Sequence, residues 1–143
     1  MHLKAGSRVP AYCTAIGKLL LSALPDKQMH AYLAHLPLAR LTAQTITSPK
    51  RRQSELARIC EQGFSIDNQE GHVALLAVAV PLHASDGRVA AGLALHGPEA
   101  RLPLRRALGI VPRLEQTAAE FSRILFGHAR QRAGARSQIG QRD

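Results

Sequence analysis

Aromatic residues and cysteines are scarce in this chain. Its 143 residues include only 3% aromatics, no tryptophan, and two cysteines, Cys13 and Cys60. The core must therefore be built from Leu, Val, Ile and Ala. Two cysteines that form no CxxC pair do not make a disulfide framework. We interpret both as small buried thiols, and the alternative is a reactive Cys13 just ahead of a helix start.

Long hydrophobic runs and catalytic motifs are also missing. No apolar run could span a bilayer and Met1 opens no secretory signal, so we expect a cytoplasmic protein with no membrane partner. There is no Walker A loop, GxGxxG or GxSxG, and the seven histidines form neither HxH nor HExxH. We therefore predict no metal, no cofactor and no enzyme. A small cytosolic enzyme using Asp67 and His96 stays as an alternative.

The formal charge of +9 suggests nucleic acid or acidic partners, but part of it lies at one end. Residues 128–143 carry four arginines against one aspartate and offer almost nothing to bury, so we predict a disordered basic tail there. Residues 1–127 are predicted to form one domain. The other basic residues are interpreted as solvated helix faces. A direct nucleic-acid-binding module, acting through the basic surface and tail, remains an alternative.

Three helices are predicted in the first half, each from a residue that favours a helix start. The predicted helices begin after Thr14, at about Lys27 and after Ser48, which is followed by a proline in the first turn. In the third helix Leu56, Ile59 and Cys60 are expected on the inner face. Gly63 is expected to end it. A polar, Thr-rich extended stretch over residues 41–47 lies between the second and third helices.

The second half predicts a sheet followed by a helix. Strand patterns cover residues 64–69, 73–82 and 89–96, and Ser-Asp-Gly between the last two favours a β-hairpin. From Leu104 onward apolar residues recur at helical spacing, and we expect Pro112 to split this helix into two pieces. The order of elements predicts an α+β domain with a mostly antiparallel sheet.

Small residues gather on one face of the predicted hairpin. Alternation places Ala77 and Ala79 on one side of the first strand, and Gly92, Ala94 and His96 on one side of the second. If these two faces coincide, they leave a hollow with His96 at its edge. Such a hollow is filled by a packed helix or left open for a ligand.

The predicted helix start at Thr14 is a second candidate site. If Thr14 caps the helix, the free N–H groups of Ala15, Ile16 and Gly17 point outward at its positive end. Such an end binds carboxylates and phosphates, and glycine lets a ligand approach the backbone. The alternative is an ordinary capped helix end that binds only water.

These residues carry a resemblance to a known family. The segment Pro10-Ala-Tyr-Cys-Thr-Ala-Ile-Gly-Lys-Leu-Leu-Leu-Ser22 resembles the P-x-x-x-T-A-x-G-K-x-x-L-A signature of the effector-binding domain of IclR-type transcriptional regulators. Four further stretches follow in the family's order, at residues 41–47, 62–70, 78–81 and 96–101. The resemblance covers about residues 9–127.

The resemblance implies a GAF-like fold, in which helices flank a curved, mostly antiparallel sheet and one face holds a small-molecule pocket. In that family the acidic group of the ligand binds the backbone of the T-A-x-G turn. The matching residues of the turn here are Thr14, Ala15, Ile16 and Gly17. The matching residues of the far side of the pocket are Asp67, Ala77, Ala94 and His96.

Two departures from the family pattern predict the kind of ligand. Ala77 and Ala94 stand where some relatives have polar residues that hold small keto acids, so we expect a wider, more apolar pocket. Together with Tyr12, Ile16 and His96, these alanines suit an aromatic or branched carboxylic acid. The Ile-Asp-Asn-Gln-Glu and Ala-Val-Pro stretches are similar to those of regulators of aromatic-acid catabolism.

The resemblance also implies partners. The expected function is a ligand-sensing domain that modulates DNA binding by a separate winged helix-turn-helix. We expect that DNA-binding domain to precede residue 1, because no two-helix DNA reader is visible in this sequence. Members of the family form dimers and tetramers, so self-association is expected as well.

Overall fold

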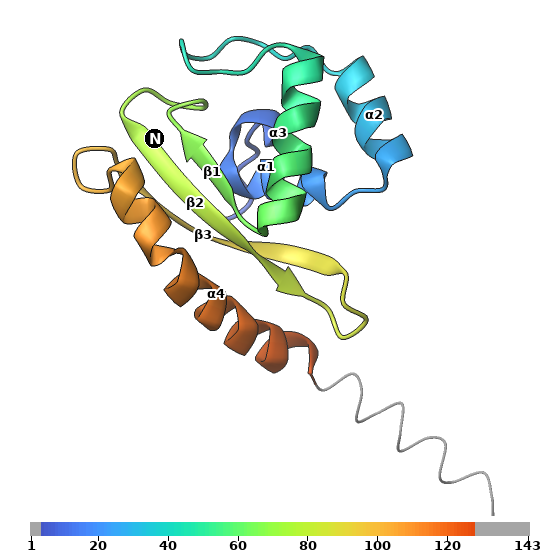
Figure 1. Cartoon of the computed structure of the whole chain (residues 1–143), viewed down its shortest axis with the longest axis vertical. Helices are drawn as coiled ribbons and strands as arrows, with labels where there is room; N and C mark the ends of the chain where they lie inside the picture. The colour runs from blue at the N-terminus through green and yellow to red at the C-terminus, as the bar shows by residue number, and fades with distance from the viewer. Residues whose placement is uncertain (1–3, 128–143) are drawn as a thin grey trace, which may run out of the picture.

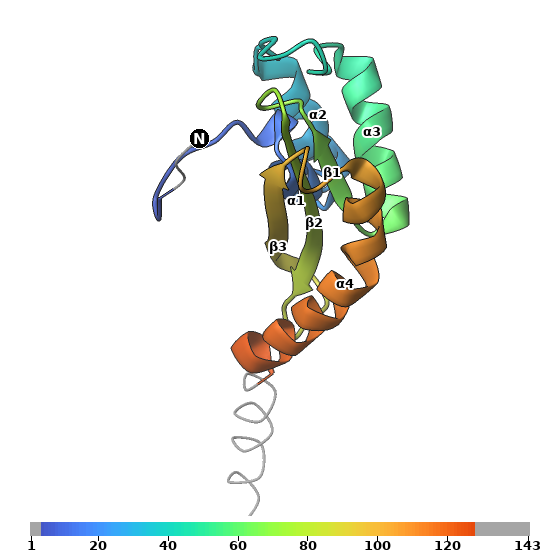
Figure 2. The same cartoon turned by 90° about the vertical axis from the view of Figure 1, so that its left-hand side faces the viewer.

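Three layers make up the structure, a computed structural model that describes residues 4–127. A sheet lies in the middle, with one long helix on one face and the remaining helices on the other (Figures 1 and 2). The basic tail predicted for residues 128–143 lies outside the described residues. The helices are η1 (Ala11–Cys13), a short 3-10 helix, α1 (Ala15–Ser22), α2 (Asp26–His35), α3 (Pro49–Gln62) and α4 (Leu104–Phe126).

The sheet is antiparallel, with its strands in the order β1-β2-β3. Its strands are β1 (Ser65–Asn68), β2 (Leu75–His83) and β3 (Val89–Pro98). The predicted hairpin is confirmed, and Gly87 adopts a positive φ of 86° in its turn. The α+β fold class is likewise confirmed. β2 starts two residues later than predicted, because Ala74, with φ of 58°, still belongs to the turn after β1.

The predicted helix ends are confirmed where a cap or a glycine defines them. The Thr14 side chain accepts a hydrogen bond from the backbone N–H of Gly17, and that of Ser48 accepts one from Arg51. Gly63 follows α3 in the left-handed conformation with φ of 80°, which glycine adopts without a steric cost. The Thr-rich stretch over residues 41–47 forms no strand.

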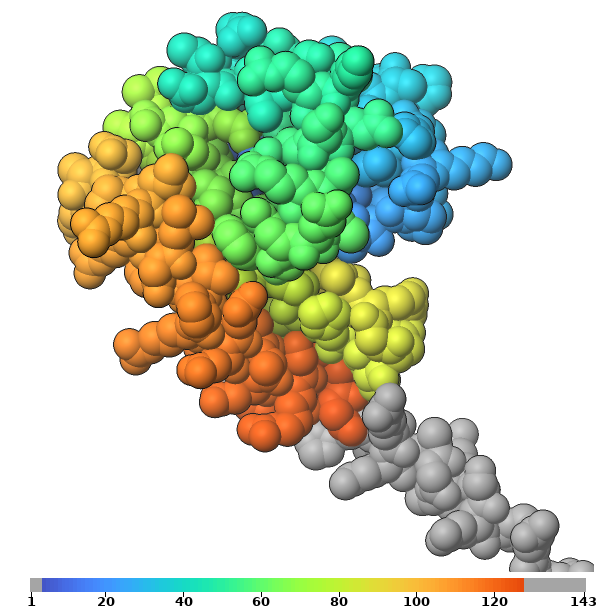
Figure 3. Space-filling view, viewed as in Figure 1, coloured from blue at the N-terminus to red at the C-terminus, as the bar shows by residue number. Residues whose placement is uncertain are grey.

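Two cores lie on opposite faces of β2, as the alternation of its side chains predicts. The residues of β2 that face α4 are Leu76, Val78, Val80 and Leu82. The residues of β2 that face α1 and α3 are Ala77 and Ala79. β2 therefore supplies side chains to both cores. Each of its fully buried Leu or Val side chains stabilises the fold by about 1.5–3 kcal/mol. In the space-filling view α3 and α4 flank the sheet, and the tip of the β2–β3 hairpin projects between them (Figure 3).

The predicted break at Pro112 is wrong, because α4 runs without interruption through this residue. Proline lacks the N–H that would bond to the carbonyl of Leu108, which costs an isolated helix about 3 kcal/mol. Both residues are exposed. On the opposite side of α4, buried Ala107, Val111 and Ala118 pack against β2 and hold the helix together on both sides of the proline.

Cys60 is exposed rather than on the inner face of α3, so that prediction is wrong. The buried face of α3 is formed instead by Arg52, Leu56 and Ile59, at intervals of four and three residues. None of the helices in the described part of the chain is long and apolar enough to cross a membrane.

Candidate functional site

The site begins at the first turn of α1, which η1 holds in a tight bend. Thr14 Oγ1 accepts a hydrogen bond from Gly17 N at 3.3 Å and donates one to Pro10 O at 3.1 Å. A Cβ atom on Gly17 would lie 2.3 Å from the carbonyl oxygen of Ala11. Only glycine therefore fits at this position of the turn.

The same turn is fastened to the sheet. The Ser65 hydroxyl of β1 donates a hydrogen bond to the Ala15 carbonyl. A side chain on Gly92 would meet Ile16 at 3.2 Å and Leu19 at 3.4 Å, so α1 rests directly on the small residues of β3. This part of the hollow is thus filled by a helix. The part beside it is open.

The open part is a cavity of about 560 Å³ between α1, the sheet and the N-terminal segment. The predicted site residues that line it are Thr14, Ala15, Ile16, Gly17, Asp67, Ala77, Ala94 and His96. Ser7, Arg8, Val9, Ala11, Leu20 and Leu75, which the sequence did not single out, complete the wall. Among the predicted residues, Tyr12 alone is placed elsewhere. Its buried side chain donates a hydrogen bond to the carbonyl of Ala39 at 2.9 Å.

The strand register explains how distant residues reach one cavity. Asp67 pairs with Ala77 across β1 and β2, and Ala77 pairs with His96 across β2 and β3. These three residues form one row on one face of the sheet. With about 4.8 Å between strands, the backbones of Asp67 and His96 stand about 10 Å apart. The methyl group of Ala77 lies between them. The row therefore has polar side chains at its two ends and only a small apolar group in the middle.

The helix end offers hydrogen-bond donors to this cavity. Gly17 N–H is bonded to the cap, whereas Ala15 and Ile16 N–H donate no hydrogen bond within residues 4–127. The first N–H groups of a helix carry partial positive charge and favour an anion. Arg8 lines the same cavity and forms no ion pair within the described residues. The donors and the cation favour a carboxylate on this side.

Asp67 supplies a polar group to the cavity from the opposite edge of the sheet. Its Oδ1 atom accepts hydrogen bonds from Glu70 N at 2.8 Å and Gly71 N at 3.4 Å, and Oδ2 accepts none within the described residues. Burial raises the pKa of Asp67 above its ordinary value, and the two backbone N–H groups and Lys18 only partly oppose this. Its Oδ2 atom can therefore accept a hydrogen bond from a ligand group.

Replacing Asp67 with asparagine is expected to change how stability depends on pH. A carboxyl group whose pKa is higher in the folded state stabilises the fold fully below its unfolded pKa, near 3.9. That contribution is lost as the pH rises through the raised folded pKa. The advantage of Asp67→Asn over wild type should therefore grow with pH across this window and then level off, as measured by urea unfolding at a series of pH values.

Asp86→Asn is the matched control, because its stability relative to wild type should change with pH in the opposite direction. The backbone N–H and guanidinium of Arg88 hold the pKa of Asp86 below its usual value. Its contribution is present above the unfolded pKa and lost as the pH falls through the folded pKa. Relative to wild type, Asp86→Asn should lose stability as the pH rises. A difference for Asp67→Asn that stays flat or shrinks with rising pH would contradict the burial of its carboxylate.

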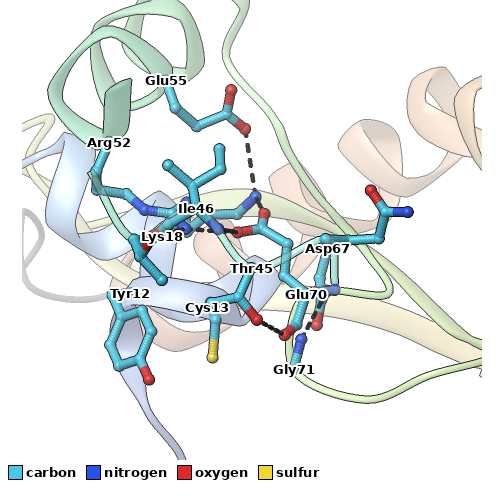
Figure 4. Close-up of polar contacts among 12 residues, drawn as sticks. Tyr12, Cys13, Lys18, Thr45, Ile46, Arg52, Glu55, Asp67, Glu70 and Gly71 are labelled. Carbon is cyan, nitrogen blue, oxygen red and sulfur yellow. Dashed lines mark hydrogen bonds and ion pairs between the residues drawn. The ribbon is translucent and has the colours of Figure 1, made fainter. Parts of the chain in front are cut away.

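Behind the cavity lies a buried network of charges that links α1, α3 and the turn after β1 (Figure 4). Lys18 Nζ lies 2.5 Å from Glu70 Oε1 and 3.3 Å from Glu55 Oε1, and Arg52 Nη2 lies 2.5 Å from Glu70 Oε2. Lys18 and Arg52 are both 0% exposed. The interpretation of all basic residues outside the tail as solvated is therefore wrong for these two. They cannot reach nucleic-acid phosphates.

The network is closed around Glu70 by further polar contacts. The hydroxyl of Thr45 donates to the Glu70 carbonyl at 2.8 Å, and that of Thr42 donates to the Gln69 carbonyl at 2.6 Å. Lys18 Nζ also donates to the carbonyl of Ile66. The Thr-rich stretch thus holds the turn that carries Asp67 and Glu70. In the sequence this stretch stood out only by its richness in threonine, and its role was not predicted.

Among residues 4–127 the candidate catalytic side chains do not come together. Burial raises the pKa of the Cys13 thiol to about 11, so it is protonated at neutral pH and is a poor nucleophile. Asp67 and His96 are separated by the width of β2, with only Ala77 between them. Within residues 4–127 no three His, Cys, Asp or Glu side chains come together as a metal site.

Comparison with known proteins identifies the family. The model of the bacterial transcriptional regulator IclR C-terminal domain matches residues 1–123. The chain belongs to the IclR family. It therefore corresponds to the effector-binding domain of these regulators, and its family is one of transcriptional regulators rather than of enzymes. The family resemblance noted in the sequence is confirmed.

Individual relatives agree with this assignment. The chain is 42% identical over 121 residues to the probable transcriptional regulator SauR of Cupriavidus necator, covering 85% of this chain and 48% of SauR. It is 36% identical over 126 residues to the Pca operon regulatory protein of Acinetobacter baylyi, covering 87% of this chain and 45% of that protein. The chain thus spans about half the length of these curated relatives.

A solved structure with a bound ligand is also similar. A double mutant of the inducer-binding domain of the PobR transcription factor from Acinetobacter, in complex with 3-hydroxybenzoic acid, superposes with a TM-score of 0.79. The sequences are 28% identical, and the match covers 82% of this chain and 67% of that one.

Proposed function

We propose that this domain senses an aromatic carboxylic acid and that binding modulates DNA binding by a winged helix-turn-helix elsewhere in the same cytoplasmic regulator. The observation that carries the proposal is the cavity of about 560 Å³, within the range of about 300–1,000 Å³ typical of ligand pockets. Its middle is apolar and its polar groups stand at two opposite ends. This arrangement suits a flat apolar ligand with a polar group at each end.

In the proposed complex the carboxylate accepts hydrogen bonds from Ala15 and Ile16 N–H, with Arg8 at the mouth of the cavity. The ring lies over Ala77 and Ala94, whose methyl groups leave room that larger side chains would fill. A hydroxyl group on the far side of the ring donates to Oδ2 of Asp67, which has no other donor within the described residues. The bound 3-hydroxybenzoic acid of the PobR domain supports a ligand of this class.

Binding is proposed to act through a shift between states of the whole regulator. A ligand changes DNA affinity only if it binds one arrangement of domains or subunits more tightly than another. Because the cavity is walled by elements from three parts of the chain, a ligand can draw them together. We further propose that the domain self-associates, so that the state of one cavity is transmitted to another subunit.

Isothermal titration against benzoate, 4-hydroxybenzoate, 3,4-dihydroxybenzoate and pyruvate tests the proposal. We expect the hydroxylated aromatic acids to bind most tightly, because they alone reach both Asp67 and the helix end. Ala94→Trp should fill the cavity and weaken binding by about 100-fold or more. Ala57→Trp, on the exposed side of α3, is the matched control and should bind like wild type.

The experiment has two outcomes that contradict the proposal. One is that none of the four acids binds to the folded wild-type domain. The other is that an acid binds equally well to wild type and to Ala94→Trp, which would place its site elsewhere. Circular dichroism of each variant shows whether a lost signal reflects a lost site or a lost fold.

A further inference from the structure

A second, smaller cavity lies beside the one proposed to hold the acid. Its volume is about 80 Å³. The residues that line both cavities are Val9, Thr14, Asp67 and Leu75. The two cavities are therefore neighbours, with Asp67 on their common wall. The smaller one, called the side cavity below, extends from Asp67 over Gly71, and the hydroxybenzoic acid of the proposed complex leaves it unfilled.

The side cavity exists because residue 71 has no side chain. A Cβ atom on Gly71 would lie 3.4 Å from Asp67 Oδ2, 3.6 Å from the carbonyl oxygen of Cys13 and 3.8 Å from Cys13 Sγ. All three are ordinary van der Waals distances, and Gly71 is not among the residues with a positive φ. Alanine would therefore fit at this position without strain. Its methyl group would take up part of the side cavity.

Size and lining limit what the side cavity can hold. One water molecule takes about 30 Å³ of liquid volume, so a cavity of about 80 Å³ has room for a group of one or two heavy atoms. The residues that supply most of its walls are Val9, Pro10, Leu41 and Leu75. Water gains few hydrogen bonds against such walls, and an apolar group that displaces it is bound favourably.

We propose that the effector carries a small apolar substituent, of the size of a methyl or methoxy group, on the ring position next to its hydroxyl group, and that the side cavity binds this substituent. The inference rests on the aromatic acid proposed above and adds the feature that distinguishes one such acid from another. The hydroxyl group donates to Asp67 Oδ2, and the substituent beside it lies over Gly71. Gly71 is thus the residue that determines this specificity.

Asp67 fixes the direction of this substituent. Its Oδ1 atom is held by Glu70 N at 2.8 Å and Gly71 N at 3.4 Å, so the carboxylate cannot turn freely. The Asp67 side chain points toward Gly71 (Figure 4). A ligand hydroxyl bound to Oδ2 therefore lies at the entrance of the side cavity. The neighbouring position of the ring is the one from which a substituent reaches into it.

A second hydroxyl group is the rival substituent. It can donate to the carbonyl of Cys13, which accepts no hydrogen bond within the described residues. A hydroxyl group gives up its hydrogen bonds with water for that one bond, so the net gain is small. It also leaves most of the apolar wall without a contact. A methyl group gives up no hydrogen bond and covers more of that wall, so the side cavity favours it.

Isothermal titration of the full chain with a matched set of acids tests the side cavity. The probes are 4-hydroxybenzoate, 4-hydroxy-3-methylbenzoate, 4-hydroxy-3-methoxybenzoate and 3,4-dihydroxybenzoate. We expect the methyl group to lower the dissociation constant about fourfold relative to 4-hydroxybenzoate, which is the factor that one buried carbon contributes. The methoxy acid should bind at least as tightly as the methyl acid, and the dihydroxy acid more weakly than either.

Gly71→Ala tests where the methyl group binds. The ratio of the dissociation constants of 4-hydroxybenzoate and its methyl derivative should fall from about four to one or below, because the new side chain fills the side cavity. Gly97→Ala is the matched control. A Cβ atom there would lie 3.7 Å from Leu102 Cβ, and Gly97 lines neither cavity, so the ratio should stay as in wild type. Leu41→Ala, which removes part of the wall and adds no atom, should also lower the ratio.

The outcomes separate this inference from the proposed function. If 4-hydroxybenzoate binds to wild type and the methyl acid binds no more tightly, the side cavity is overturned and the proposed function stands. The same holds if the ratio stays near its wild-type value in both Gly71→Ala and Leu41→Ala. Tightest binding by 3,4-dihydroxybenzoate overturns the apolar substituent in favour of a second hydrogen-bond donor. If none of the acids binds, the proposed function fails and this inference fails with it.

Discussion

Replacing Glu70 with alanine is expected to destabilise the domain by about 3–5 kcal/mol, because it leaves two buried cations without their shared partner. Glu70 lies 2.5 Å from both Lys18 and Arg52, neither of which water can reach. Glu55, at 3.3 Å, neutralises only the lysine. Two guanidinium atoms of Arg52, Nε and Nη1, already have no hydrogen-bond partner in the described residues. Urea unfolding followed by circular dichroism measures the loss.

Two further variants test whether the expected loss of stability comes from the buried charge of Glu70. Glu70→Gln keeps the shape and one acceptor oxygen but loses the charge, so its loss of stability should be smaller than that of Glu70→Ala. Asp86→Ala removes the carboxylate of an exposed ion pair with Arg88 and should lower the midpoint of unfolding far less than Glu70→Ala does. A Glu70→Ala protein as stable as Asp86→Ala would show that water or ions reach the buried cations.

Replacing Gly17 with alanine should destabilise the domain by about 3 kcal/mol and abolish acid binding. The added Cβ atom would stand 2.3 Å from the Ala11 carbonyl oxygen and 2.4 Å from its Cα atom, both of which are backbone. Neither can move aside as a flexible side chain can. The turn must open, which displaces the Ala15 and Ile16 N–H groups from the cavity. Thermal unfolding and titration with 4-hydroxybenzoate measure the two effects.

Gly109 provides the control for this substitution. It lies inside α4, and a Cβ atom there would meet nothing within 4 Å. Gly109→Ala should therefore stabilise the domain by about 0.5–1 kcal/mol, because alanine favours a helix over glycine. If Gly17→Ala were instead stabilising to the same degree, the close contact between η1 and α1 would not exist in solution.

The local features of the fold were predictable because they depend on neighbours in the chain. Thr14 and Ser48 cap helices through bonds to residues three positions on, and Gly63 ends a helix through its own conformational freedom. The alternation of β2 and β3 likewise predicted which small residues share a face. The capped helix start, the hairpin face and the family resemblance together pointed to eight of the residues that line the cavity, but the predicted set also included Tyr12, which the structure directs toward Ala39 instead.

The burial of charge was not predictable, because it depends on segments distant in the sequence. Lys18, Arg52 and Glu70 come from α1, α3 and the turn after β1, and each looks like a surface residue among its own neighbours. Inside the fold Glu70 is the shared partner of both cations, and their positive charges in turn stabilise its buried carboxylate. Likewise Pro112 looked like a helix break, and only the packing of α4 on both sides of it keeps the helix whole.

The order of helices and strands, their caps and the small-residue face of the hairpin follow from the sequence, because hydrogen bonds and side-chain alternation act within a few residues. Only the tertiary structure determines which part of that small-residue face is covered by a helix and which part stays open. α1 covers Ala79 and Gly92, while the space over Ala77 and Ala94 stays open between Asp67 and the helix end. The extent of the covered part depends on where α1 packs on the sheet. Contacts between segments distant in the sequence determine this position.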